Sequence, residues 1–445
     1  MKVFLVSLGC DKNLVDSEHI SGILSENGYT FTDDESDADI IIINSCCFIN
    51  DAKEESINTI FEMAKYKEDK CKALVLAGCL AQRYHDEIED EIPEIDICIG
   101  TTAFDEIAKT LNTFFKEKHK IVDLEDINCP AGFSAPRNIS TFGSYGYLKI
   151  AEGCDKHCTY CIIPKVRGDF RSVPIDNVLD EARQMVSLGV KELILIAQET
   201  TMYGQDIYGK KSLHILIHEL SKIDGVKWIR VLYCYPEDIY PEFIDEIKNN
   251  EKVCHYLDLP IQHASDRILK LMGRQTTKDE ISSRINALKE EVPDIVLRTT
   301  LISGFPGETD EDHKEVMDFV EVSKFDKLGV FTYSQEEGTP AATMDDQVDE
   351  DTKNQRRNEI MELQQEIVFE KNESLVGKAF EVIIEGKIPM ENAYIGRSYM
   401  DAPGVDSNIF VVTDEELMSG DFVKVSVTGA NDYDLIGDLT ERLED

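Results

Sequence analysis

Two separate sets of three cysteines carry the chemistry expected of this chain. One set lies within the short segment GCDKHCTYC, and each member of the other set directly follows an apolar run. The two sets are Cys154, Cys158 and Cys161, and Cys10, Cys46 and Cys79. Four-iron clusters are normally held by four thiolates, so three thiolates leave one iron open to a small molecule. We therefore expect two [4Fe-4S] sites, each with an open iron.

Zinc is the alternative for the C-x3-C-x2-C loop. Structural zinc takes four ligands in a tetrahedron, and His157 inside the loop is the only nearby candidate for a fourth. Because His157 flanks an inner cysteine, it is badly placed to close a tetrahedron. The loop also begins at Gly153, where a predicted barrel strand ends, which favours a cluster at a barrel mouth.

Composition indicates an intracellular enzyme. The chain has 445 residues and 12 cysteines, and the apolar run from Val3 to Leu8 is too short for a signal peptide or a membrane span. We expect a cytoplasmic protein with reduced thiols. The other cysteines show no ligand spacing, so we interpret them as packing residues. They are Cys47, Cys71, Cys98, Cys129, Cys234 and Cys254.

The charge of the chain argues against nucleic acid as the substrate. There are 87 acidic and 46 basic residues, a formal net charge of -41. Such a surface repels phosphate backbones and attracts basic partners.

Residues 1–125 alternate apolar runs with amphipathic stretches. The runs KVFLVSLG, ADIIIIN and KALVLAG read as buried strands, and helical patterns separate them. This β-α-β-α-β-α order predicts an α/β domain with a doubly wound parallel sheet. Cys10, Cys46 and Cys79 then meet at the carboxyl edge of the sheet, where such folds bind ligands.

A linker is predicted over residues 126–144, and repeated βα units follow it over residues 145–370. Six apolar runs separated by helical patterns predict a partial (β/α)6 barrel, whose active site lies at the carboxyl ends of the strands. These runs begin at Tyr147, Glu192, Trp228, Tyr256, Val296 and Leu328.

A mixed-charge helix from Asp351 to Glu373 leads to the last predicted domain, residues 371–441. Its short β-type runs with glycine turns predict a small five-stranded, OB-like barrel. From Lys371 onward there are 16 acidic and six basic residues, so we expect this barrel to bind a basic protein rather than RNA.

The chain resembles the radical-SAM methylthiotransferases, which combine an amino-terminal methylthiotransferase domain, a radical-SAM barrel and a TRAM domain. Four segments resemble the RimO branch, which modifies an aspartate of the small-subunit ribosomal protein S-twelve. They are SLGCDKNLVDSE, YLKIAEGCDKHCTYCIIPKVRG, LDLPIQHAS and RTTLISGFPGET. Enzymes of the branch that modifies transfer RNA typically carry a GCQMN-type first motif instead.

The resemblance implies that Cys154, Cys158 and Cys161 hold the cluster that cleaves S-adenosylmethionine (SAM). It implies that the amino-terminal set holds an auxiliary cluster that delivers sulfur, with two SAM molecules used per methylthio group placed on the aspartate β-carbon. The partners implied are the basic ribosomal protein, free or within the small subunit, and an electron donor. Candidate SAM-pocket residues are Tyr160, Gln198, Gly304, Gly307 and Glu308.

Two other functions remain open at this point. The same chemistry could act on adenosine in transfer RNA. A non-catalytic, metal-stabilised protein that binds ribosomes would instead hold zinc and consume no SAM.

Overall fold

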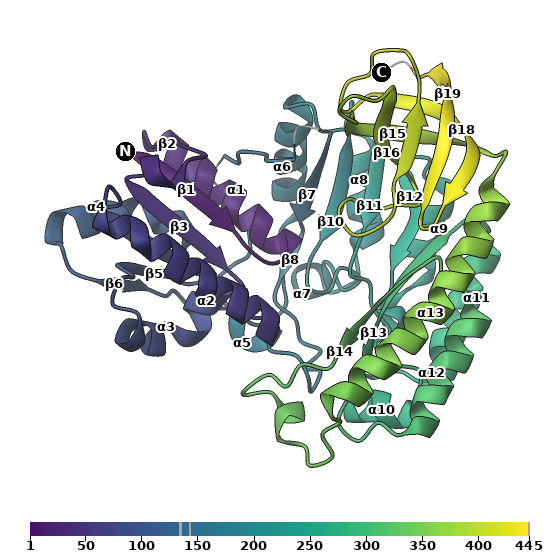
Figure 1. Ribbon diagram of the computed structural model, residues 1–445, viewed down its shortest axis with the longest axis horizontal. Helices are drawn as coiled ribbons and strands as arrows, with labels where there is room; N and C mark the ends of the chain where they lie inside the picture. Colours follow the sequence, from purple (N-terminus) through teal and green to yellow (C-terminus); the bar gives the residue numbers. More distant parts are fainter. Residues whose placement is uncertain (133–135, 142–143, 444–445) are drawn as a thin grey trace. The chain divides into compact units, whose positions relative to one another are not determined.

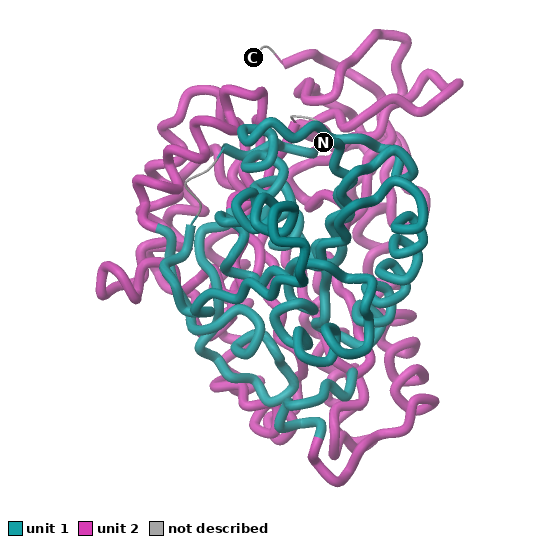
Figure 2. Tube along the Cα trace, turned by 90° about the vertical axis from the view of Figure 1, so that its left-hand side faces the viewer, with its two compact units in different colours: residues 1–140, 149–173, 334–342 teal, residues 141–148, 174–333, 343–445 magenta. Residues whose placement is uncertain are grey.

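The computed structural model describes residues 1–132, 136–141 and 144–443. Residues 133–135 and 142–143, part of the predicted linker, and the last two residues lie outside this description. The chain forms two compact units (Figure 2). The first comprises residues 1–140, 149–173 and 334–342, and the second comprises residues 141–148, 174–333 and 343–445. The cysteine loop and the segment after it thus belong to the first unit.

The first unit contains a parallel sheet of six strands, ordered β2-β1-β3-β4-β5-β6 (Figure 1). The strands are β1 (Lys2–Ser7), β2 (Thr30–Phe31), β3 (Ile40–Ser45), β4 (Ala73–Gly78), β5 (Ile97–Ile99) and β6 (Ile121–Asp123). Because the chain adds β2 on one side of β1 and β3 on the other, the strand order reverses between β1 and β3. Open α/β sheets bind ligands at such a switch point.

Helices cover both faces of this sheet. On one face α1 (Asp11–Glu26) and α4 (Ile107–Glu117) pack against alternate strand residues such as Ile40 and Ile42. On the other face α2 (Asn50–Ala64) and α3 (Cys79–Glu91) pack against Ile41 and Ile43. Burial on both faces explains the near-continuous apolar strands.

The first unit also includes the cysteine loop. A two-stranded antiparallel ribbon of β8 (Ala151–Glu152) and β9 (Arg171–Ser172) flanks it. The short helix α5 (Ile163–Arg167) follows Cys161 directly, and its Val166 joins Ile162 in the core beneath α2 and α3.

The second unit contains a six-stranded sheet in which neighbours follow sequence order, β7-β10-β11-β12-β13-β14. The strands are β7 (Tyr145–Lys149), β10 (Glu192–Ile196), β11 (Trp228–Val231), β12 (Val253–Asp258), β13 (Val296–Ser303) and β14 (Lys327–Thr332). The helices between them are α6 (Ile175–Ser187), α7 (Gln205–Tyr208), α8 (Leu213–Ser221), α9 (Pro241–Asn249), α10 (Asp266–Leu271), α11 (Lys278–Glu291) and α12 (Asp310–Ser323). All six predicted strands are present.

Helix α13 (Glu350–Leu375) packs against α12, β13 and β14 and leads into a closed five-stranded barrel. The barrel strands are β15 (Ala379–Lys387), β16 (Ala393–Ser398), β17 (Ile409–Val412), β18 (Phe422–Asn431) and β19 (Asp434–Arg442). The predicted fold class is confirmed. Among the described helices, none has the length and apolar character needed to cross a membrane.

Three short strands and one helix within residues 1–125 were missing from the sequence prediction. β2, β5 and β6 have only two or three residues, too few to show a period, and their hydrogen bonds come from neighbouring strands. The predicted packing cysteines Cys47, Cys71, Cys98, Cys234 and Cys254 are buried, whereas Cys129 is partly exposed.

Candidate iron–sulfur sites

The amino-terminal cysteines lie at the carboxyl ends of three adjacent strands, β1, β3 and β4. Cys10 caps the amino end of α1, Cys46 follows β3, and Cys79 is the first residue of α3. Amino-terminal helix positions favour a thiolate because backbone N–H groups and the helix dipole point at it. Strands β1 and β3 are neighbours at the switch point of the sheet, so Cys10 and Cys46 lie close together although they are far apart in the sequence.

Glycine allows the close approach of these turns. Gly9 has φ +88°, and a Cβ atom there would lie 2.7 Å from Cys46 Cβ and 2.9 Å from Cys46 Sγ. Real Cβ atoms are not found so close to other carbons, so a side chain at position 9 would displace Cys46.

The three thiols interact electrostatically. Burial raises the pKa of Cys46 to about 12, and the neighbouring Cys79 and Cys10 thiols add to the rise. Burial also raises the pKa of Cys79, whereas the charge of Arg167 and a hydrogen bond from it lower that pKa. Such thiols are protonated without metal, and binding a cluster displaces their protons. Cys10 is exposed, so this site is open to small molecules.

The second set lies in the loop between β8 and α5. Burial raises the pKa of the Cys161 thiol, and the nearby Cys158 and Cys154 thiols contribute. Cys154 donates its N–H to Gly168 O at 3.1 Å, and Cys161 donates to Cys158 O at 3.0 Å. The structure thus brings together the members of each predicted set.

The donor set at each site is three cysteine thiols, the ligand type that iron–sulfur clusters take. Within residues 1–132, 136–141 and 144–443, no three His, Cys, Asp or Glu side chains form a group able to hold a single metal ion. His157, the alternative zinc ligand, is exposed and has a left-handed φ of 50°.

A buried network of charged residues lies beside the amino-terminal set. Lys149 Nζ lies 2.5 Å from Asp16 Oδ1 and 2.7 Å from Glu152 Oε2. Arg167 Nη1 lies 2.8 Å from Asp16 Oδ2 and 3.3 Å from Glu152 Oε2, and Arg167 Nη2 donates to Asn13 Oδ1 at 2.5 Å. Two cations and two carboxylates are thus buried together without net charge, as buried charges require.

Sequence reasoning did not single out this network. The sequence did contain a sign of this network. Lys149 and Glu152 lie in the otherwise apolar and glycine-containing segment KIAEG, and Arg167 lies in KVRG. Cys47 was also closer to the site than expected, because its thiol donates to Cys79 O at 3.3 Å.

The predicted SAM-pocket residues are divided between the two units. Tyr160 lies in the cysteine loop of the first unit, and Gln198 follows β10 in the second. Gly304, Gly307 and Glu308 form the turn after β13. Whether they all contact one SAM molecule stays a prediction.

Within the turn after β13, Glu308 bonds to the chain itself. Its Oε2 accepts the N–H groups of Gly304 at 2.8 Å and Phe305 at 3.1 Å, and Arg356 Nη1 donates to its Oε1 at 3.0 Å. Gly304 has φ +70°, and a Cβ atom there would lie 2.2 Å from Lys353 Cγ. Both residues therefore maintain the shape of this turn.

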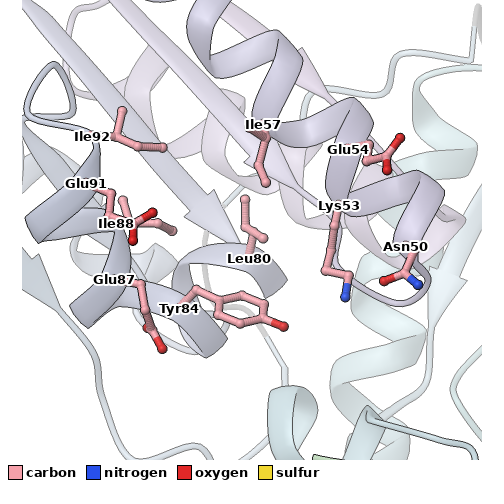
Figure 3. A pocket seen from close by; sticks show the side chains of 10 residues that line it. All are labelled: Asn50, Lys53, Glu54, Ile57, Leu80, Tyr84, Glu87, Ile88, Glu91 and Ile92. Carbon is pink, nitrogen blue, oxygen red and sulfur yellow. The ribbon is translucent and has the colours of Figure 1, made fainter. Parts of the chain in front are cut away.

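A groove of about 430 Å³ lies between α2 and α3 of the first unit. Isoleucine, leucine and tyrosine side chains form its apolar lining, and Glu54, Glu87 and Glu91 stand at its edge (Figure 3). Lys53 also lines it, but its Nζ is paired at 2.9 Å with Oε2 of the buried Glu336. The groove is therefore apolar and acidic.

Comparison with known proteins decides the family. Residues 2–100 match the model "Uncharacterized protein family UPF0004", residues 148–320 match the Radical SAM superfamily, and residues 376–439 match the TRAM domain. The protein named "Ribosomal protein uS12 methylthiotransferase RimO" of Lachnoclostridium phytofermentans is 56% identical over 98% of this chain and 99% of its own length. The chain belongs to the RimO family of methylthiotransferases.

Other RimO-family proteins agree. The protein of the same name from Acetivibrio thermocellus is 51% identical over 98% of this chain and 98% of its own length. The one from Clostridioides difficile is 50% identical over the full length of both chains. This RimO-family chain is a radical-SAM methylthiotransferase, and its cofactors are SAM and iron–sulfur clusters.

Two solved structures show that the fold is shared more widely. The radical SAM methyltransferase TsrM of Kitasatospora setae, with cobalamin and a [4Fe-4S] cluster bound, has a TM-score of 0.55 at 13% identity over 76% of this chain and 73% of its own. The cobalamin-dependent SAM radical enzyme OxsB has a TM-score of 0.54 at 13% identity over 83% of this chain and 56% of its own. At these identities the likeness concerns the fold alone.

Proposed function

We propose that the protein replaces a hydrogen on the β-carbon of an aspartate in ribosomal protein uS12 with a methylthio group. The observation that carries this proposal is full-length identity of 50–56% to proteins named for that reaction. Two three-cysteine sets in one compact unit supply the ligands that two clusters would need. The transfer-RNA alternative and the non-catalytic alternative find no support among these relatives.

The two sets have different tasks in this proposal. Cys154, Cys158 and Cys161 hold the SAM-cleaving cluster, and Cys10, Cys46 and Cys79 hold the auxiliary cluster. When bound, these groups supply a radical able to remove hydrogen from unactivated carbon and a sulfur site for transfer. The chain contributes burial, which keeps water from Cys154 and Cys158.

Tyr160 of the first unit and, in the second unit, Gln198 and the turn from Gly304 to Glu308 are the residues that would bind SAM. The hydrogen bonds of Glu308 to the backbone of that turn fix the carboxyl end of β13. A fixed turn at this position suits a barrel active site, where side chains at the strand ends position the ligand. Gly307 has φ +80°, its N–H donates to Asp346 O at 2.6 Å and its carbonyl accepts from Arg267 Nη2 at 2.6 Å, so its backbone is held in place as well.

The acidic groove between α2 and α3 fits a basic segment of uS12. Glu54, Glu87 and Glu91 would attract lysine and arginine side chains, while the apolar lining would accept their aliphatic stems. The net charge of -41 acts in the same direction at longer range. The reaction would take place in the cytoplasm with an electron donor, on uS12 either free or within the small subunit.

Mass spectrometry of the product tests this function. Reconstituted protein would be incubated anaerobically with SAM, sulfide, reductant and uS12, and in parallel with transfer RNA. We expect one added methylthio group on a uS12 aspartate. Methylthioadenosine in the transfer RNA, with uS12 unchanged, would keep the chemistry but overturn the substrate.

A further inference from the structure

Arg167 connects the two cysteine sets of the first unit. It is the last residue of α5, the helix that follows Cys161. The next residue, Gly168, accepts the hydrogen bond of the Cys154 N–H at 3.1 Å. The Arg167 side chain reaches in the other direction, to Asn13 beside the amino-terminal set and to the Cys79 thiol.

The contacts of Arg167 fix where its charge lies. The side chain is 2% exposed, and Asp16, Glu152 and Asn13 accept its N–H groups. Asn13 is itself held by its Nδ2, which donates to Leu8 O and Ser45 O at 2.9 Å each. Leu8 lies two residues before Cys10, and Ser45 lies directly before Cys46. The guanidinium is therefore locked against the turns that carry Cys10 and Cys46.

The Cys79 thiol lies beside this guanidinium, because Cys79 Sγ is 3.9 Å from Asn13 Oδ1, the same atom that accepts from Arg167 Nη2. The potential of an iron–sulfur cluster rises when positive charge or hydrogen-bond donors lie near its sulfur ligands, because the more negative reduced state is stabilised. Arginine keeps its charge at every accessible pH.

We propose that Arg167 is a positioning residue that holds a buried positive charge against the auxiliary cluster and raises its reduction potential. The inference rests on the proposed assignment of Cys10, Cys46 and Cys79 as ligands of that cluster. It adds a consequence for the reaction: the segment that forms the SAM-cleaving site also sets the electronic state of the sulfur-delivering site.

The test isolates one cluster. In the full-length Cys154→Ala/Cys158→Ala/Cys161→Ala background only the auxiliary cluster can bind, and iron content with the visible spectrum shows whether it does. Failure of this background to bind iron would refute the ligand assignment itself. With iron bound, an anaerobic redox titration followed by electron paramagnetic resonance gives the midpoint potential.

Two charge-balanced variants are then compared in that background. Arg167→Gln/Asp16→Asn leaves the Lys149–Glu152 pair, and the matched control Lys149→Met/Glu152→Gln leaves the Arg167–Asp16 pair. Each removes one cation and one anion from the same network. We expect the Arg167 variant to have a lower reduction potential. At the midpoint potential of the parent, the ratio of reduced to oxidised cluster should fall at least tenfold, which corresponds to a shift of about 59 mV for one electron. The control should shift less than threefold in that ratio.

Equal shifts in both variants, or no shift in the Arg167 variant, would overturn the proposal. If the Arg167 variant loses its iron, Arg167→Lys replaces it, because lysine keeps the charge but cannot form the same fork of hydrogen bonds. Because the charge is kept, we expect that ratio to change less than threefold, and a tenfold fall there would equally overturn the proposal. In the Cys10→Ala/Cys46→Ala/Cys79→Ala background, the SAM-site cluster should shift less than the auxiliary one.

Discussion

Glu192 on β10 and Arg397 on β16 form a fully buried ion pair, with 2.7 Å between Glu192 Oε2 and Arg397 Nη2. Arg230 on β11 donates to the other carboxylate oxygen, Oε1, also at 2.7 Å. One carboxylate therefore joins the radical-SAM sheet to the terminal barrel within the second unit.

Removing that carboxylate should destabilise the second unit strongly. Glu192→Gln leaves two buried guanidinium groups without their shared anion, and breaking a buried pair in this way costs about 3–5 kcal/mol. The free energy of unfolding from denaturant titration measures it. Glu291→Gln is the control, because its pair with Lys248 is about half exposed and should contribute less than about 1 kcal/mol. Similar losses in the two variants would contradict the expectation.

The same pair predicts a pH dependence. Burial opposes ionisation of Glu192, but the charges of Arg397 and Arg230 prevail and lower its pKa below the ordinary 4.5. The unfolded chain then binds the proton more readily, so the stabilisation is complete above pH 4.5 and is lost as pH falls through the folded pKa. The difference in unfolding free energy between the parent and Glu192→Gln should be constant from pH 7 to pH 5.5 and shrink below pH 4.5. A difference that grew on acidification would have the wrong sign.

Single cysteine substitutions should separate the two halves of the reaction. Cys154→Ala should abolish SAM cleavage, measured as 5′-deoxyadenosine, because a proposed ligand of the cleaving site is lost. Cys10→Ala should spare cleavage and remove methylthio transfer. Cys129→Ala, outside both sets, should leave both activities intact. Full transfer activity in Cys10→Ala would refute the auxiliary-site assignment.

Two glycines with similar positive φ test the approach of Gly9 to Cys46. Gly9 and Gly28 have φ of +88° and +82°, so alanine meets the same left-handed strain, about 1–2 kcal/mol, at both. A Cβ atom at Gly28 has no neighbour within 4 Å, whereas at Gly9 it would collide with Cys46. In the auxiliary-only background, Gly9→Ala should lower the bound iron and Gly28→Ala should retain it. If the two variants bound the same amount of iron, the position of Cys46 would not be required for iron binding.

Charge reversal in the groove tests the docking of uS12. Glu87→Lys/Glu91→Lys should weaken binding at low salt by about tenfold, equal to about 1.4 kcal/mol, with a smaller effect at high salt. Glu26→Lys/Glu117→Lys makes the same change in net charge at exposed positions on α1 and α4. Titration of uS12 into each variant gives the affinities. If the two variants weaken binding equally, the groove has no special role.

The sequence predicted those parts of the fold that repeat locally. Strands such as β3 and β4 are continuous apolar runs, and the three cysteines that follow such runs predict one site from sequence alone. The Asp16–Arg167 contact could not be found this way, because its partners are 151 residues apart. Their pairing depends on α5 packing into the core of the first unit, a tertiary event that no local pattern encodes. The amphipathic pattern of α4, by contrast, was present in the sequence and was overlooked.

The buried ion pairs of the first unit bear on how the protein could be dissected. A fragment ending at residue 125 would keep Cys10, Cys46 and Cys79 but leave behind Arg137, Lys149 and Arg167. Glu18, whose Oε2 accepts from Arg137 Nε at 2.7 Å, and Asp16 would then be buried carboxylates without cations. The amino-terminal module is thus not self-sufficient, and transplanting it onto another enzyme would require the cysteine loop and α5 to travel with it.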